Sequence, residues 1–181
     1  PEFVKMQAGL PAATEKVAAM VAAKAADAEL KAGLKTLHDR SLTDPAPFAA
    51  FHAFLESTYP LIHQGLSREV VAEHSLLYTW EGTDSGAPAV LLMGHMDVVG
   101  IEPGTEAGWE HPPFAGERDE EWLWGRGTTD DKGSVIAIFE AVEGLLAEGF
   151  RPDVTLYLAV GHDEEIGGGQ GAASLSALLA S

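Results

Sequence analysis

The pattern of apolar and polar positions predicts a long amphipathic helix in the second half of the chain. Between residues 134 and 148, apolar side chains recur at helical spacing and form one stripe along the helix. Gly149 follows this stripe, where a glycine commonly terminates a helix. We therefore expect a helix over 134–148 that packs one face against the rest of the domain.

Strands are predicted on either side of this helix. Residues 89–93 and 154–160 are continuous apolar runs, and the first is typical of a strand buried on both faces. Residues 122–124 form a short strand, and a run of glycines leads into a final short helix over 172–179. Strands and helices that alternate in this order predict an α/β domain with a mostly parallel sheet flanked by helices.

The first part of the chain has a different character. Residues 11–37 are rich in alanine, which favours one or two helices with a weakly apolar face. A second helix should begin near Asp44 and Pro45 and end at Pro60. Its apolar side consists of Phe48, Phe51 and Leu55. We therefore divide the chain into an Ala-rich helical segment, 1–43, and an α/β part, 44–181.

Composition and charge exclude several classes of protein. The 181 residues are 46% apolar and 22% charged, which fits a soluble globular domain. The formal charge of -17 repels phosphate backbones and anionic membranes, so we expect no nucleic acid or membrane partner. With no cysteine, any metal site must use His, Asp and Glu. The sequence has neither a signal peptide nor a long apolar span, and we expect a cytoplasmic protein.

Histidine and acidic residues gather where the two predicted strands end. His95 and Asp97 follow the first apolar run, and Glu164 and Glu165 follow the second. In open α/β sheets, sites form outside the carboxyl ends of the strands, so these segments can meet. The His-x-Asp triplet alone also fits a structural hydrogen-bonded pair. The consecutive acids repel one another unless a cation lies among them, which favours a metal site.

A third acidic segment precedes the long helix. Asp130 and Asp131 lie between a glycine-broken strand and the start of that helix. Their carboxylates can either cap the helix or bind a cation, and the residue pattern leaves both interpretations open. The glycines nearby match neither a dinucleotide-binding fingerprint nor a phosphate-binding loop.

Taken together, these segments resemble the co-catalytic zinc peptidase family that includes carboxypeptidase S, aminoacylase, acetylornithine deacetylase and succinyl-diaminopimelate desuccinylase. The resemblance covers residues 44–181, the N-terminal part of that family's catalytic domain, and depends on four ordered motifs at 94–99, 109–114, 125–132 and 161–165. Residues 75–80 and the Gly-His pair before the acids are most similar to the carboxypeptidase S and N-acyl-amino-acid hydrolase branch.

The resemblance implies a role for each residue of the site. His95 would bind one zinc ion, Asp130 would bridge two, and Glu165 would bind the second. Asp97 would orient His95, and Glu164 would act as the general base, so Asp97 and Glu164 are the expected catalytic residues. Cobalt or manganese are the expected substitutes for zinc. The family also places a cis peptide bond after the bridging residue, here Asp130.

The resemblance implies a hydrolase that cleaves an amide or peptide bond next to a C-terminal amino acid, with small peptides or N-acyl amino acids as substrates. A deacetylase or desuccinylase, or a non-catalytic metal-binding or interaction domain, remain alternatives. Two further ligands and a lid or dimerisation domain are expected in the family but not found in this sequence. We therefore expect a fragment that is inactive alone, and a homodimer stays open.

The remaining histidines and tryptophans are expected to have structural roles. His162 should form hydrogen bonds that shape the loop before the acids, and the other histidines should pack or face solvent. These are His38, His52, His63, His74 and His111. Three tryptophans are expected to anchor the core or the loops rather than contact substrate, namely Trp109, Trp122 and Trp124.

Overall fold

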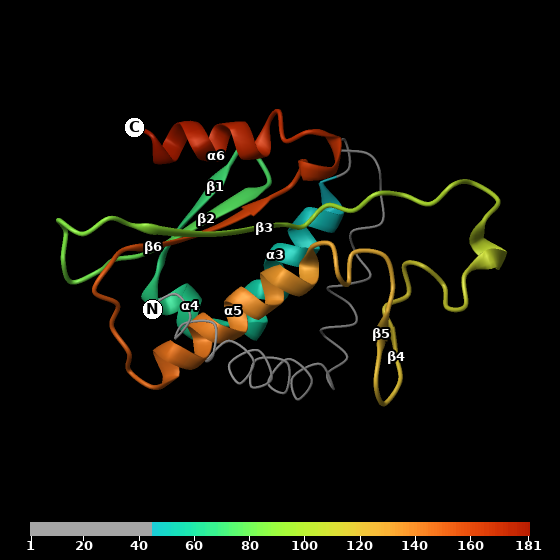
Figure 1. Ribbon diagram of the computed structural model, residues 1–181, viewed down its shortest axis with the longest axis horizontal. Coiled ribbons are helices and arrows are strands. Elements are labelled where there is room, and N and C mark those ends of the chain that lie inside the picture. The colour runs from blue at the N-terminus through green and yellow to red at the C-terminus, as the bar shows by residue number, and fades with distance from the viewer. Residues whose placement is uncertain (1–44) are drawn as a thin grey trace, which may run out of the picture.

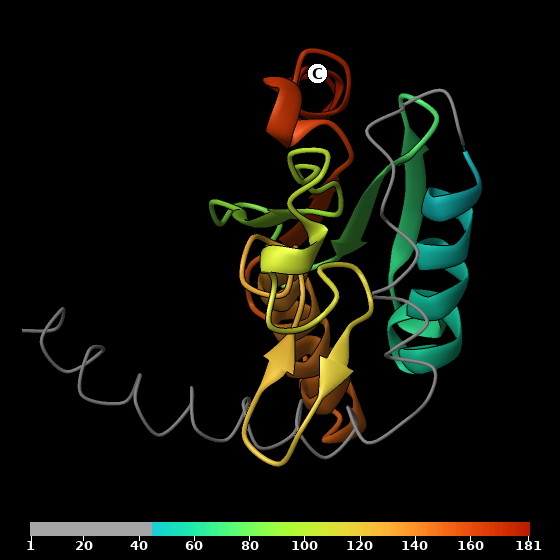
Figure 2. The same cartoon turned by 90° about the vertical axis from the view of Figure 1, so that its right-hand side faces the viewer.

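The computed structural model describes residues 45–181, in which helices cover both faces of a four-stranded sheet. Helices α3 (Ala46–Thr58), α4 (Pro60–Gly65) and α5 (Lys132–Ala147) lie on one face, and α6 (Gly171–Leu179) lies on the other (Figure 1). Figure 2 shows the same arrangement from the side, with α6 and α3 on opposite sides of the strands. The predicted α/β class with flanking helices is confirmed. The predicted N-terminal helices, the segment 1–43, His38 and Asp44 lie outside the described residues.

The sheet is mixed rather than mostly parallel. Its strand order is β1 (Ser67–Val71), β2 (Ser75–Trp80), β6 (Leu156–Gly161) and β3 (Val90–His95). β3 and β6 are parallel, whereas β1 with β2 and β2 with β6 are antiparallel. A tight turn joins β1 to β2 and so makes them antiparallel, while α5 provides the crossover that a parallel pair requires. The sequence pattern revealed the crossover but not the hairpin.

Two apolar layers hold the helices to the sheet. The larger layer lies between the sheet and α3, α4 and α5, and includes Phe51, Tyr78, Phe139 and Leu158. The smaller layer joins α6 to the other face through Leu77, Ala159 and Leu175. β2 alternates between the two layers, so it is buried on both faces. The helix predicted over 134–148 is α5, and Gly149 follows it with a φ of 73° as expected for a glycine terminus.

Strand β3 is an edge strand, and the prediction that its apolar run is buried on both faces is wrong. Val90, Leu91 and Met93 are 42%, 43% and 64% exposed. Among the described residues, no strand pairs with the outer edge of β3. An apolar run predicts a strand, but it does not show whether the strand lies inside the sheet or at its edge. That position depends on pairing with residues distant in sequence.

Several short elements complete the fold. Pro60 follows the end of α3, as predicted, but it also begins α4, which was not predicted. The segment after β3 is a long connection that contains a 3-10 turn (Glu106–Gly108) and a small hairpin of β4 (Glu117–Arg118) and β5 (Leu123–Trp124). Among residues 45–181, no helix has both the length and the apolar character needed to cross a bilayer.

Candidate metal centre

Three segments that are far apart in sequence meet at one end of the sheet. His95 is the last residue of β3 and pairs with Gly161 at the end of the parallel strand β6. Asp130 lies just before α5, and Glu164 and Glu165 lie in a 3-10 turn (Glu164–Ile166) that follows β6. Parallel strands place their carboxyl ends side by side, and therefore the imidazole and the carboxylates become neighbours.

His95, Asp130 and Glu165 are close enough to share an ion. Each offers one ligand atom, and these atoms all lie within 4.8 Å of one another. His95 Nε2 is 3.0 Å from Asp130 Oδ1. The His95 side chain is 9% exposed, whereas that of Asp130 is 76% exposed. One imidazole and two carboxylates are ligands that suit zinc and related divalent cations, so these residues fit the metal that the sequence implied.

Asp97 connects His95 to the acidic turn. Its Oδ1 is 3.3 Å from His95 Nδ1, and its carboxylate accepts the backbone N–H groups of Glu164 and Glu165 at 3.2 and 3.0 Å. Burial opposes ionisation of this carboxyl group, but these hydrogen bonds outweigh it and hold the pKa of Asp97 below its ordinary value. Asp97 therefore fixes both a candidate ligand, His95, and the backbone of the turn that carries another, Glu165.

The carboxylates around His95 favour its protonated form. Burial alone would lower the pKa of His95, but the hydrogen bonds and charge of Asp97 and the hydrogen bond to Asp130 raise it to about 9. At neutral pH the imidazole is therefore charged in the metal-free protein. A metal ion that binds through Nε2 must displace this proton.

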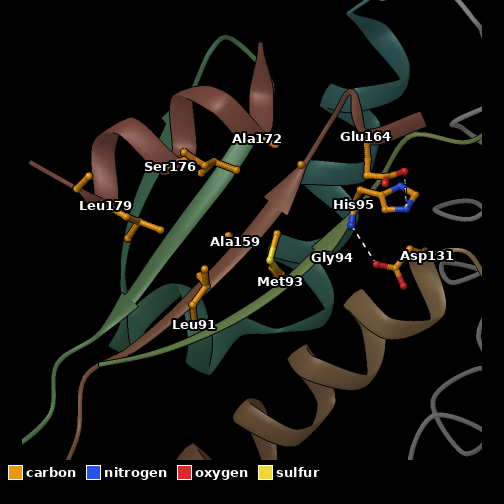
Figure 3. A pocket seen from close by; sticks show the side chains of 13 residues that line it. Leu91, Met93, Gly94, His95, Asp131, Ala159, Glu164, Ala172, Ser176 and Leu179 are labelled. Atoms are coloured by element: carbon orange, nitrogen blue, oxygen red, sulfur yellow. Dashed lines mark hydrogen bonds and ion pairs between the residues drawn. The ribbon is translucent and has the colours of Figure 1, made fainter. Parts of the chain in front are cut away.

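The three consecutive acids have three different surroundings. Asp163 is 1% exposed and accepts the backbone N–H groups of Gln170 and Gly171. Glu164 has a 59% exposed side chain, and its Oε2 lies 3.6 Å from His95 Nε2 (Figure 3). Glu165 is partly buried and belongs to the candidate ligand group. Only two of the three acids therefore face the site.

Asp131 takes a role that neither sequence interpretation described. It is the residue that precedes α5, but its side chain makes no capping bond to that helix. Its Oδ2 instead accepts the backbone N–H of His95 at 3.2 Å, as Figure 3 shows. A Cβ at Gly94 would lie 2.8 Å from this oxygen, so only glycine fits there. The predicted cis peptide bond between Asp130 and Asp131 is confirmed.

Lys132 is a buried cation beside the site that the sequence interpretation missed. It is 1% exposed, and its Nζ has no hydrogen-bond partner among the described residues. Burial lowers the pKa of Lys132 to about 8, although the charge of Asp97 opposes this effect. The only signal in the sequence was its place directly after Asp130 and Asp131 at the start of a helix.

The other histidines of the described part of the chain lie outside the candidate ligand group. His63 Nε2 and Nδ1 bond to the Tyr78 hydroxyl and the Tyr59 carbonyl, and His52 Nε2 bonds to the His74 carbonyl. His162 forms the predicted structural hydrogen bond, with its Nδ1 2.6 Å from Ser75 Oγ.

Two of the three tryptophans anchor the long connection, as predicted. Trp124 stacks on His111 and donates its Nε1–H to Asp119, and Trp109 lies under the guanidinium of Arg126. Trp122 is 62% exposed and is not part of the core.

Comparison with known sequences supports the assignment of these motifs. Residues 91–180 match Peptidase family M20/M25/M40. Carboxypeptidase S of Saccharomyces cerevisiae is 47% identical over 134 residues, which are 73% of this chain and 23% of that protein. The N-fatty-acyl-amino acid synthase/hydrolase PM20D1 of Mus musculus is 41% identical over 144 residues, which are 78% of this chain and 28% of that protein. The chain thus spans about a quarter of the length of these relatives.

The fold agrees with this relationship. Human carnosine dipeptidase 1 superimposes with a TM-score of 0.64 at 19% identity, over 92% of this chain and 37% of that chain. At this identity, the similarity is evidence for the fold alone. The sequence match, the shared fold and the meeting of the motifs at the strand ends lead to one conclusion. The chain belongs to Peptidase family M20/M25/M40 and is similar in sequence to carboxypeptidase S and to the N-fatty-acyl-amino acid synthase/hydrolase.

Proposed function

We propose that His95, Asp130 and Glu165 bind zinc, and that Asp130 bridges two zinc ions in the complete site. The observation that carries this proposal is the meeting of their three ligand atoms within 4.8 Å. The exposure of Asp130 supports the bridging role, because a 76% exposed carboxylate leaves room for ions on both of its oxygens. Cobalt and manganese are the expected substitutes, since they accept the same nitrogen and oxygen ligands.

Glu164 is the proposed general base, and Asp97 is the proposed orienting residue. Bound zinc polarises a substrate carbonyl and makes a nearby water molecule more acidic. The Glu164 carboxylate would take the proton that this water loses. Its exposure and its position beside His95, outside the candidate ligand group, support this role. Asp97 keeps His95 and the acidic turn in place through its bonds to His95 Nδ1 and to two backbone amides.

The chain is proposed to be one part of a longer hydrolase that cleaves an amide or peptide bond next to a C-terminal amino acid. Its match to only about a quarter of carboxypeptidase S and of the N-fatty-acyl-amino acid synthase/hydrolase supports this view. The names of those two relatives favour small peptides or N-acyl amino acids as substrates. A deacetylase or desuccinylase differs only in the acyl group that it removes.

Adjacent isosteric substitutions separate the proposed ligand from the proposed base. Glu165→Gln is expected to weaken zinc binding by about ten-fold or more, because it removes a charged ligand. Glu164→Gln, one residue away, should change the zinc affinity by less than about three-fold, since no ligand is lost. Calorimetric titration with zinc gives both values, with Asp130→Ala as the positive control and the exposed Glu120→Ala as the charge control. Equal zinc affinity in wild type and Asp130→Ala would refute the metal site.

The hydrolytic part of the proposal is tested in a chain of the same length as carboxypeptidase S. Release of free amino acid from N-acyl amino acids and dipeptides should require zinc and be abolished by Glu164→Gln, while zinc binding remains. Turnover that survives Glu164→Gln unchanged would remove Glu164 from its role as base.

One observation favours a second candidate function, an interaction domain. An apolar groove of about 570 Å³ lies between β3 and α6 (Figure 3). Its lining includes Leu91, Met93, Leu175 and Leu179. Large exposed apolar surfaces mark contact sites. A domain whose only role is contact would bind zinc no better in the wild type than in Asp130→Ala, and the titration above therefore separates the two functions.

A further inference from the structure

A buried polar network lies beneath the turn that carries Glu164 and Glu165. Ser75, the first residue of β2, is 0% exposed, and its Oγ lies 2.6 Å from Nδ1 of His162, which is 1% exposed. Asp163 is also 1% exposed, and its two carboxylate oxygens accept the N–H groups of Gln170 and Gly171 at 2.7 and 3.0 Å. Ser75 and His162 thus form one buried hydrogen bond, and Asp163, the next residue along the chain, ties the segment to the start of α6. Buried polar groups whose hydrogen bonds are satisfied make the structure around them rigid.

The start of α6 closes tightly over this network. A Cβ placed on Gly171 would lie 2.6 Å from both Ser75 Oγ and Asp163 Oδ1, and 2.7 Å from His162 Nδ1. Real Cβ contacts are essentially never shorter than 3.0 Å, so three polar side chains converge where only a hydrogen atom fits. His162 is also enclosed by aromatic rings, with Phe48 at 5.8 Å and His74 at 5.3 Å between ring centroids.

The network is connected directly to the backbone of the acidic turn. The Asp163 carbonyl accepts the N–H of Ile166 at 3.3 Å and the N–H of Gly168 at 2.8 Å. On the opposite side, Asp97 accepts the N–H groups of Glu164 and Glu165. The backbone of the turn is therefore held by the Asp97 carboxylate and by the Asp163 carbonyl, and Asp163 directly follows His162, which Ser75 bonds.

We propose that Ser75 is a positioning residue for the metal site: its hydroxyl fixes His162 and, together with Gly171, sets the path of the turn that brings Glu165 into ligand distance of His95 and Asp130. This inference rests on the proposed function. Ser75 is fully buried and cannot touch a substrate, so its whole effect reaches the site through the turn.

Two substitutions disturb the network in different ways. Ser75→Ala removes the hydroxyl that bonds His162 and leaves the apolar surroundings intact. Gly171→Ala adds a methyl group that must push apart the three polar side chains. Two control substitutions lie elsewhere. Thr58→Val removes a buried hydroxyl that has no hydrogen-bond partner in the described chain. Val142→Ala makes a cavity where α5 packs against the rest of the core.

The first measurement is zinc affinity by calorimetry, at a temperature where each variant is fully folded. Ser75→Ala is expected to weaken zinc binding about ten-fold, the lower end of the effect of residues that orient metal ligands. Gly171→Ala should weaken it further. The cobalt-loaded variants should show an altered visible spectrum, because the ligand geometry changes. Thr58→Val and Val142→Ala should keep the wild-type affinity even though Val142→Ala loses stability.

The second measurement requires no metal. In metal-free protein, Ser75→Ala should accelerate amide hydrogen exchange at Glu165 and Gly168 by about ten-fold, and the two controls should not. If these amides exchange as in the wild type, or if Ser75→Ala binds zinc with unchanged affinity, the inference is wrong. If the wild type binds no zinc but the exchange accelerates as expected, the turn is positioned by Ser75 and the proposed function is the part that fails.

Discussion

The raised pKa of His95 couples zinc binding to pH. At pH 7, a pKa of about 9 places the imidazole two pH units inside its protonated range. Removing this proton costs about 1.4 kcal/mol per unit, so zinc binding at pH 7 should be weakened by about 2.7 kcal/mol, or about 100-fold. The apparent zinc affinity should therefore rise about ten-fold per pH unit above pH 7 and level off near pH 9.

Calorimetry in two buffers with different ionisation enthalpies measures this coupling. At pH 7, the binding of one zinc ion should release about one proton from His95 to the buffer. Asp97→Asn serves as the matched variant, because it removes the neighbouring charge that raises the pKa of His95 and retains the size of the side chain. Its pH dependence should flatten above pH 7, whatever happens to its absolute affinity. Equal zinc affinity at pH 7 and pH 8.5 in the wild type, without proton release, would refute this reasoning.

Three further predictions concern stability, each measured by chemical denaturation of the metal-free protein. Lys132→Met should stabilise the fold by about 1–2 kcal/mol at pH 7, because it removes a buried ammonium without a hydrogen bond. This advantage should shrink above pH 8, where the native lysine, its pKa lowered to about 8, loses its proton. Glu143→Ala should cost about 1–2 kcal/mol, since its carboxylate accepts two backbone amides at the start of α4. Phe139→Ala should cost about 3–5 kcal/mol because Phe139 is fully buried, whereas the exposed Trp122→Ala should stay within about 0.5 kcal/mol.

Elements defined by local patterns could be predicted from the sequence. The apolar stripe of α5 needs only helical periodicity, and the structure places that helix within two residues of its expected start. His95 and the acids after β6 were found because each follows an apolar run, and parallel strands bring such positions together. The metal roles of His95, Asp130 and Glu165 remain predictions, although the structure brings the three residues together.

Features that depend on distant residues could not be predicted. The apolar run of β3 is the same whether the strand lies inside the sheet or at its edge, and only the pairing decides which side chains are exposed. Ser75 and His162 are separated by 87 positions, so their hydrogen bond leaves no mark in either local sequence. Lysine is usually a surface residue, so the sequence does not indicate that Lys132 is buried. In the fold its Nζ lies against Gly127, where a Cβ would be only 2.6 Å away.

Four of the acids in and around the centre form two pairs that differ in exposure, and this difference explains how so many carboxylates fold together. Asp97 and Asp163 are largely shielded from solvent, and each satisfies its charge with two backbone N–H groups. Asp130 and Glu164 remain largely exposed, so water can screen their repulsion until a cation arrives. The shielded pair therefore sets the shape of the centre, and the exposed carboxylates provide its charge. Substituting Asp97 or Asp163 should therefore change the geometry of a bound ion. Substituting Asp130, the exposed ligand, should instead weaken the attraction of the site for the ion.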